Sequence, residues 1–156
     1  MSFNSQVART LDDEHRAHLA LLGRVEGALA RRDDAALAPL AAPLVRQLEE
    51  EVERHFGFEE QQLFPRMAEA GDDALAAMLT EEHESMRAVA AELAPLARAL
   101  AAGAWPDRAA LQRLALEWVE RMVAHIQKET MALLPLLDDL LDEDSDRELS
   151  FAYSAG

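Results

Sequence analysis

Two stretches of the sequence decide the fold: HFGFEEQQLFP at residues 55–65 and HIQKETMALLP at residues 125–135. In each stretch a histidine is followed four residues later by a glutamate, and a proline comes six residues after the glutamate. A histidine and a glutamate at this spacing lie on one face of an α-helix, about one turn apart. The chain therefore carries one helical pattern twice, His55 with Glu59 and His125 with Glu129, at an offset of 70 residues.

A second pair of segments repeats in the same way. Leu11-x-x-Glu14-His15 matches Leu79-x-x-Glu82-His83 at an offset of 68 residues. We therefore expect two helical hairpins of one plan, each supplying a lone histidine and a His-x3-Glu pair. Two such halves, packed about a pseudo-twofold axis, would bring six residues around one point, which suits two metal ions better than one. These residues are His15, His55, Glu59, His83, His125 and Glu129.

The rest of the chain is predicted to be helical as well. Apolar residues recur at intervals of three and four, and breaks are expected only near residues 31–34, 71–73 and 103–107, with an irregular segment around Pro39 and Pro43. Short connections favour antiparallel neighbours, so we expect an all-α fold, an up-down-up-down antiparallel four-helix bundle over residues 1–141. Residues 142–156 are expected to form a frayed acidic and polar tail, and the acidic run from Asp138 to Asp146 is interpreted as solvated charge.

The position of the two glutamates within the apolar stripes indicates a metal site in the core of this bundle. Burying a carboxylate without a partner costs several kcal/mol, so something must compensate its charge. A cation between facing helices would do so, with imidazole nitrogens and carboxylate oxygens as ligands. The nature of the metal stays open at this point, because such donors accept Fe, Mn or Zn.

Composition excludes several other classes of protein. The 156 residues carry a formal net charge of −15, which would repel nucleic acid, and there is no cysteine for disulfides or thiol chemistry. The first residues lack an apolar signal core, and the longest apolar run, MALLPLL, is too short to span a bilayer. We therefore expect a cytoplasmic protein with neither nucleic acid nor a membrane as partner.

The two quoted stretches, together with His15 and His83, closely resemble hemerythrin-like (HHE cation-binding) domains over about residues 5–140. The resemblance implies a non-haem di-iron site with the four histidines as terminal ligands and Glu59 and Glu129 bridging the two Fe ions. It also implies an oxo, hydroxo or water bridge, and O₂, peroxide or NO as the small ligand.

Two departures from the oxygen-carrying hemerythrins bear on the activity. Those proteins have His-x3-His on the third helix, whereas Arg87 stands four residues after His83 here. Their fourth helix uses His-x4-Asp, whereas this chain has Glu129 followed by Thr130. With four histidines instead of five, the chain resembles the bacterial HHE branch, which puts reversible O₂ storage in doubt and favours redox reactivity.

Four further residues have two interpretations each, and a fifth, Glu60, has one. His18, one turn after His15, is either a fifth ligand or a histidine at the edge of the bundle. Arg87 either faces the cluster or forms an ion pair at its rim. Glu14 and Glu82 either orient imidazoles or are surface acids, and Glu60 is expected to be solvated.

Three functions compete on these residues. The first is a di-iron protein that senses O₂, peroxide or NO or turns them over modestly, so whether the chain is an enzyme stays open. The second is a di-iron oxidase or peroxidase, although ferritin-like sites use Glu-x-x-His in the opposite order. The third is metal storage, or an adaptor whose bundle metal merely stabilises.

Overall fold

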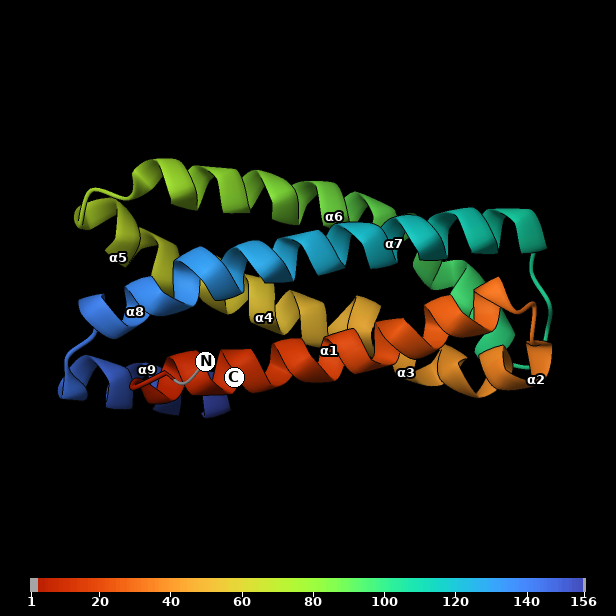
Figure 1. Cartoon of the computed structure of the whole chain (residues 1–156), viewed down its shortest axis with the longest axis horizontal. Coiled ribbons are helices and arrows are strands. Elements are labelled where there is room, and N and C mark those ends of the chain that lie inside the picture. Colours follow the sequence, from red (N-terminus) through yellow and green to blue (C-terminus); the bar gives the residue numbers. More distant parts are fainter. Residues whose placement is uncertain (1–2, 156) are drawn as a thin grey trace.

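The computed structural model describes residues 3–155, and every regular element in that range is a helix. The longest helices are α1 (Gln6–Ala30), α6 (Asp73–Ala101) and α7 (Arg108–Lys128). They lie along the long axis of the molecule (Figure 1). The prediction of an all-α protein is confirmed. Within the described residues, no helix is both long and apolar enough to cross a membrane.

Shorter segments complete the helical stretches between these long helices. Residues 34–69 form α2 (Asp34–Leu37), a 3-10 turn (Ala38–Leu40), α3 (Ala41–Arg46), a π-helical turn (Gln47–Glu51), α4 (Val52–Phe58), a second π-helical turn (Glu59–Leu63) and α5 (Phe64–Glu69). After α7, a third π-helical turn (Glu129–Leu133) leads into α8 (Leu134–Leu140), and α9 (Glu143–Ala155) follows.

The helices break at the three places that the sequence predicts. Gly71 and Gly103 adopt φ angles of 96° and 88°, a left-handed conformation that costs glycine little and commonly ends a helix. The side chains of Asp33 and Asp107 accept hydrogen bonds from the backbone N–H groups of the helices that they precede.

The segment around Pro39 and Pro43 is more regular than expected. It is helical throughout, changing only from α to 3-10 and back to α. Each proline lies near the start of a helical segment, where its missing N–H is not needed. The expectation of an irregular segment was therefore wrong.

The repeated prolines explain the π-helical turns that follow the two His-x3-Glu pairs. Pro65 and Pro135 lie in the first turns of α5 and α8 and cannot donate the next helical hydrogen bond. The preceding turn widens, so that the N–H of Phe64 reaches the carbonyl of Glu59, five residues back. In the same way, the N–H of Leu134 reaches the carbonyl of Glu129. Each of these glutamates therefore stands at the start of a widened turn.

Two apolar clusters fill the core, one toward each end of the long axis. On α1, Leu11 belongs to one cluster and Leu22 to the other, and the buried His15 lies between them. On α6 the buried His83 likewise lies between residues of the two clusters. A polar layer thus separates two apolar halves.

The C-terminal segment corrects a prediction. Residues 143–155 form α9, which packs on α1 and buries Leu149 and Tyr153, whereas a frayed tail was expected. Two residues of the acidic run from Asp138 to Asp146 are not simply solvated. The Asp146 carboxylate accepts hydrogen bonds from the backbone N–H groups of Gln6 and Val7 at 2.8 and 2.9 Å. Asp138 does the same for Asn4 and Ser5. Carboxylates favour this position because the N–H groups at a helix start lack partners. Residue 156 lies outside the described residues.

Candidate metal centre

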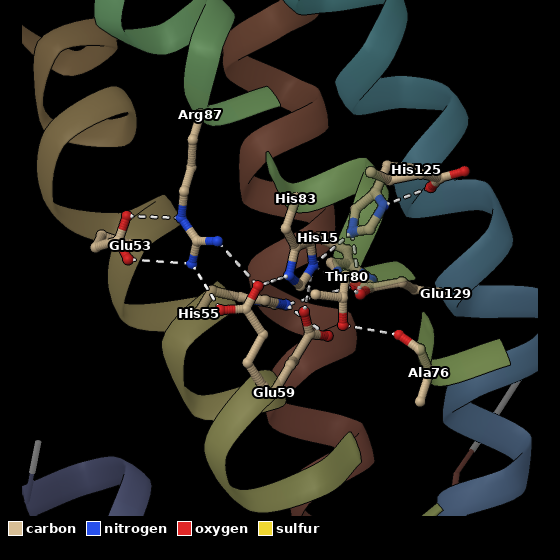
Figure 2. Close-up of polar contacts among 12 residues, drawn as sticks. His15, Glu53, His55, Glu59, Ala76, Thr80, His83, Arg87, His125 and Glu129 are labelled. Atoms are coloured by element: carbon tan, nitrogen blue, oxygen red, sulfur yellow. Dashed lines mark hydrogen bonds and ion pairs between the residues drawn. The ribbon is translucent and has the colours of Figure 1, made fainter. Parts of the chain in front are cut away.

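The six residues predicted to converge all lie in the polar layer between the two apolar clusters, and their side chains point toward one another (Figure 2). None is more than 3% exposed. They form two groups of four, and within each group one donor atom from every residue lies within 4.8 Å of the others. The first group is His15, His55, Glu59 and Glu129, and the second is Glu59, His83, His125 and Glu129. Both groups contain both glutamates.

Each glutamate reaches from one histidine pair to the other. The two carboxylate oxygens of Glu129 lie 2.8 Å from Nε2 of His15 and 3.1 Å from Nε2 of His125. Those of Glu59 lie 3.3 Å from Nε2 of His55 and 3.2 Å from Nε2 of His83. The arrangement is that of two carboxylates between two pairs of imidazoles.

Several inward-facing polar atoms have no hydrogen-bond partner, which tests whether a cation fits. Both carboxylate oxygens of Glu59, Oε2 of Glu129 and Nε2 of His55 are buried and unpartnered. In addition, Nε2 of His83 and Nε2 of His125 face each other at 3.1 Å. Buried polar atoms without partners cost free energy, and a cation among them would satisfy oxygens and nitrogens together. The residues therefore fit metal ions.

Without a metal ion, protons compensate the buried carboxylates. Burial by itself lowers the pKa of His83, but the carboxylates of Glu129 and Glu59, which lie 3.7 and 3.2 Å from its Nε2, outweigh burial and raise this pKa to about 9. The pKa values of His55 and His125 are also raised against the effect of burial, chiefly by the charges of Glu59 and Glu129 respectively. Burial would raise the pKa of Glu129, yet His125 and other imidazoles hold it well below its usual range.

The other ring nitrogen of each ligand candidate also has a partner. Nδ1 of His55 lies 3.0 Å from Glu14, Nδ1 of His83 2.8 Å from Glu60, and Nδ1 of His125 2.8 Å from Glu82. A carboxylate accepts a proton held on Nδ1, which leaves Nε2 facing the centre. His15 differs, because its Nδ1 lies 3.4 Å from the Thr130 hydroxyl.

These contacts decide between the interpretations of Glu14, Glu82 and Arg87, and they correct the expectation for Glu60. Glu14 and Glu82 orient imidazoles, but each orients a histidine of another helix and not the one that follows it in sequence. The expectation that Glu60 is solvated was wrong, because the adjacent helix α6 brings His83 to it. Arg87 takes the rim position: its guanidinium donates hydrogen bonds to Glu53 (Figure 2). It also donates to Glu60.

His18 is buried yet belongs to neither four-residue group. The indole N–H of Trp118 donates to Oε1 of Gln47 at 2.9 Å, which leaves the Gln47 amide nitrogen facing Nδ1 of His18 at 3.1 Å. Because that amide nitrogen can only donate, Nδ1 accepts and the ring proton resides on Nε2. Nε2 therefore offers a hydrogen rather than a lone pair, which argues against a fifth ligand in this arrangement. Burial, with the charge of His55, lowers the pKa of His18 to about 4, so the ring stays neutral.

Aromatic packing fixes the ring of His83. It stacks on Phe56, with ring centroids 3.8 Å apart and planes within 6° of parallel, and Phe64 stacks against it at 5.6 Å. Both phenylalanines lie in the first quoted stretch, one residue after His55 and one before Pro65. That stretch therefore supplies two candidate metal ligands of its own and also the aromatic rings that hold His83, a candidate ligand on another helix.

Comparison with known families agrees with this geometry. The family described as the hemerythrin HHE cation binding domain matches residues 6–137. The chain belongs to this family. No curated protein and no solved structure matches it significantly. The hemerythrin match spans all six converging residues and the carboxylates on their Nδ1 atoms, and it ends before α9.

Sequence reasoning missed Gln47 and Tyr153 in the surroundings of this hemerythrin-type centre. Tyr153 donates from α9 to Glu14. The spacing of Leu149 and Tyr153 is that of one helix face and could have indicated that α9 packs. No local pattern indicates Gln47, because its role depends on Trp118, which is 71 residues away.

Proposed function

We propose that this hemerythrin-family chain binds two metal ions, with iron as the native metal, and that the loaded centre reacts with O₂, peroxide or NO. The observation that carries the proposal is the pair of four-residue groups that share both glutamates. His15 and His55 would hold one ion, and His83 and His125 the other, with Glu59 and Glu129 common to both. The scaffold that we propose is the up-down-up-down four-helix bundle, with α9 added on α1.

The donor set supports iron without excluding its neighbours. Imidazole nitrogen with carboxylate oxygen suits Fe, and also Mn and Zn, whereas thiolate ligands are absent from the sequence. Two such ions, when bound, supply redox chemistry and positions for small exogenous ligands.

The chain's own residues prepare the centre for loading. Glu14, Glu60 and Glu82 hold protons on three Nδ1 atoms, so that Nε2 of His55, His83 and His125 faces inward. The apolar clusters on either side exclude bulk water.

The position of Arg87 supports reactivity over reversible carriage of O₂. The oxygen carriers have an additional histidine at this position. Here Arg87 is paired with Glu53 and Glu60, and its guanidinium has no atom that could bind a metal ion. Four histidines and two shared carboxylates would leave positions open to exogenous ligands on both ions. We therefore propose that O₂ oxidises the reduced centre and is not released unchanged.

The experiment is anaerobic loading with Fe²⁺, followed by exposure to O₂, H₂O₂ or NO in stopped-flow absorption. The proposal expects oxidation by O₂ that is not reversed when the O₂ pressure is lowered. Full recovery of O₂ would instead indicate a carrier, and no response to any of the three would indicate storage or a structural site. His125→Gln is the matched control, because it removes a metal-binding nitrogen from one four-residue group only. This variant should lose the rapid oxidation by O₂.

A further inference from the structure

The C-terminal helix α9 reaches the surroundings of the metal centre although it lies beyond the family match, which ends at residue 137. Its contribution is Tyr153, which is 5% exposed. The Tyr153 hydroxyl donates a hydrogen bond to Oε1 of Glu14. The same oxygen lies 3.0 Å from Nδ1 of His55. One carboxylate oxygen thus joins α9 to a histidine of the centre.

Tyr153 is held by residues that flank this histidine on α4. Its ring packs on Phe58, with centroids 4.6 Å apart, and the Arg54 guanidinium lies over the ring at 4.3 Å from the centroid. Arg54 also donates to the backbone carbonyl of Tyr153 at 2.9 Å. At the other end of α9, Asp146 accepts from the first N–H groups of α1. α9 is therefore fixed at both ends, and the end near the centre is fixed by the turn that carries His55.

The other two Nδ1 carboxylates are held differently. Lys128 donates to Glu82, which pairs with His125, and Arg87 donates to Glu60, which pairs with His83. Lys128 is on the same helix as His125, and Arg87 is on the same helix as His83. Only Tyr153 comes from a separate helix, 139 residues from Glu14 in sequence. Among these three hydrogen-bond donors it alone lies on a helix that carries none of the candidate ligands.

We propose that Tyr153 is a positioning residue for the metal centre, and that docking of α9 and loading of metal favour each other. This inference rests on the proposed two-metal function. A metal ion on Nε2 fixes the rotation of the His55 ring and therefore the position of Nδ1 and of Glu14. A fixed Glu14 presents a fixed acceptor to Tyr153. By thermodynamic reciprocity, the factor by which docking tightens metal binding equals the factor by which metal stabilises docking.

The expected factor is modest because Tyr153 acts through two intervening side chains. Loss of a group that directly holds a ligand histidine weakens metal binding about 10- to 100-fold. The hydroxyl of Tyr153 is one contact further from the metal. We therefore expect its loss to weaken metal binding by a smaller factor, about three- to tenfold.

The test uses the full chain loaded with Co²⁺ or Zn²⁺. Co²⁺ affinity is measured by chelator competition, the His55 Nδ1–H resonance by NMR of the Zn²⁺ protein, and protection of α9 by hydrogen exchange with and without Zn²⁺. Tyr153→Phe removes only the hydroxyl. Leu149→Ala loosens α9 by removing buried apolar contact without touching Glu14, and it serves as the comparison.

We expect the wild type to bind two Co²⁺ ions and to protect α9 more strongly when loaded. Tyr153→Phe should keep the stoichiometry, bind about three- to tenfold more weakly, shift the His55 resonance and lose the metal-dependent protection. Unchanged affinity and an unchanged His55 resonance in Tyr153→Phe, beside a wild type that binds two ions, would overturn this inference alone. Equal weakening by both variants with the His55 resonance unmoved would show that α9 acts only by packing and would also overturn it. A wild type that binds no Co²⁺ would overturn the proposed function itself.

Discussion

Raising the pH should destabilise the metal-free protein. His83 is fully buried, and the nearby carboxylates of Glu129 and Glu59 hold its pKa at about 9, above the ordinary value of 6.5, although burial alone would lower it. A group whose pKa is raised in the folded state binds its proton more tightly there than in the unfolded chain. Its stabilising contribution is complete below about pH 6.5 and is lost as the pH rises through about 9.

The magnitude follows from the size of the shift. Each pKa unit corresponds to about 1.4 kcal/mol, so a rise from 6.5 to about 9 amounts to about 3 kcal/mol from His83 alone. The raised pKa values of His55 and His125 add to the loss in the same direction. Glu129, with its lowered pKa, contributes stability above its ordinary pKa of 4.5 that is lost only as the pH falls. The metal-free protein should therefore be most stable on the acidic side of neutrality.

The assay is urea unfolding of chelator-stripped protein, followed by far-ultraviolet circular dichroism between about pH 6 and pH 9.5. The free energy of unfolding should fall by about 3 kcal/mol or more across this range. His83→Gln, which cannot titrate, should be less stable at the acid end and show a shallower fall. The metal-loaded protein should not show the fall, because metal ions take the place of the protons. A free energy of unfolding that is constant or rises with pH in the metal-free wild type would refute this account of the buried charges.

Three further predictions concern single residues. Gln47→Glu can accept from Trp118 and from Nδ1 of His18 at once, so the His18 proton should move from Nε2 to Nδ1, as ¹⁵N NMR of the imidazoles would show. Glu129→Gln should destabilise even the metal-free protein, by about 3–5 kcal/mol in urea unfolding, because it leaves buried imidazolium groups without their partner. Glu60→Ala should weaken metal binding about 10- to 100-fold in chelator competition, because it frees Nδ1 of His83.

Two of these variants have a control at the surface of the protein, Glu129→Gln for stability and Glu60→Ala for metal affinity. Glu117→Gln removes a surface carboxylate paired with Arg121 and should change stability by less than about 0.5 kcal/mol. Glu50→Ala removes an exposed carboxylate and should leave metal affinity unchanged. A His18 proton that stays on Nε2 in Gln47→Glu, or a Glu129→Gln protein as stable as the Glu117→Gln control, would contradict the hydrogen-bond assignments.

The convergence of the six residues could be predicted because its signals are local or repeated. The four-residue spacing places each His-x3-Glu pair on one face, and the two repeats place both pairs and the lone histidines at the same depth in the core. The prolines at 65 and 135 were visible as part of the repeat, but their consequence, the widened turns at Glu59 and Glu129, needed the hydrogen bonds of the structure.

The surroundings of the centre could not be predicted because they depend on which helices become neighbours. Glu60 points away from His55 on its own helix, so its partner is visible only when α6 brings His83 to it. His18 is a one-turn neighbour of His15 and resembles a ligand in sequence, but Gln47 decides its tautomer. In α9 the short apolar face was overlooked because most residues around it are acidic or polar. The capping role of its acidic residue could not be predicted either, because an acidic residue that caps another helix looks the same in sequence as a solvated one.

The most direct test of the two-metal centre is anomalous diffraction from crystals of the iron-saturated chain, with iron content measured on the same preparation. The account predicts two iron ions per chain, one at each four-residue group, about 3.5–4 Å apart as expected when carboxylates are shared between two ions. A single ion in a fully loaded chain, or iron bound only to surface carboxylates, would contradict it.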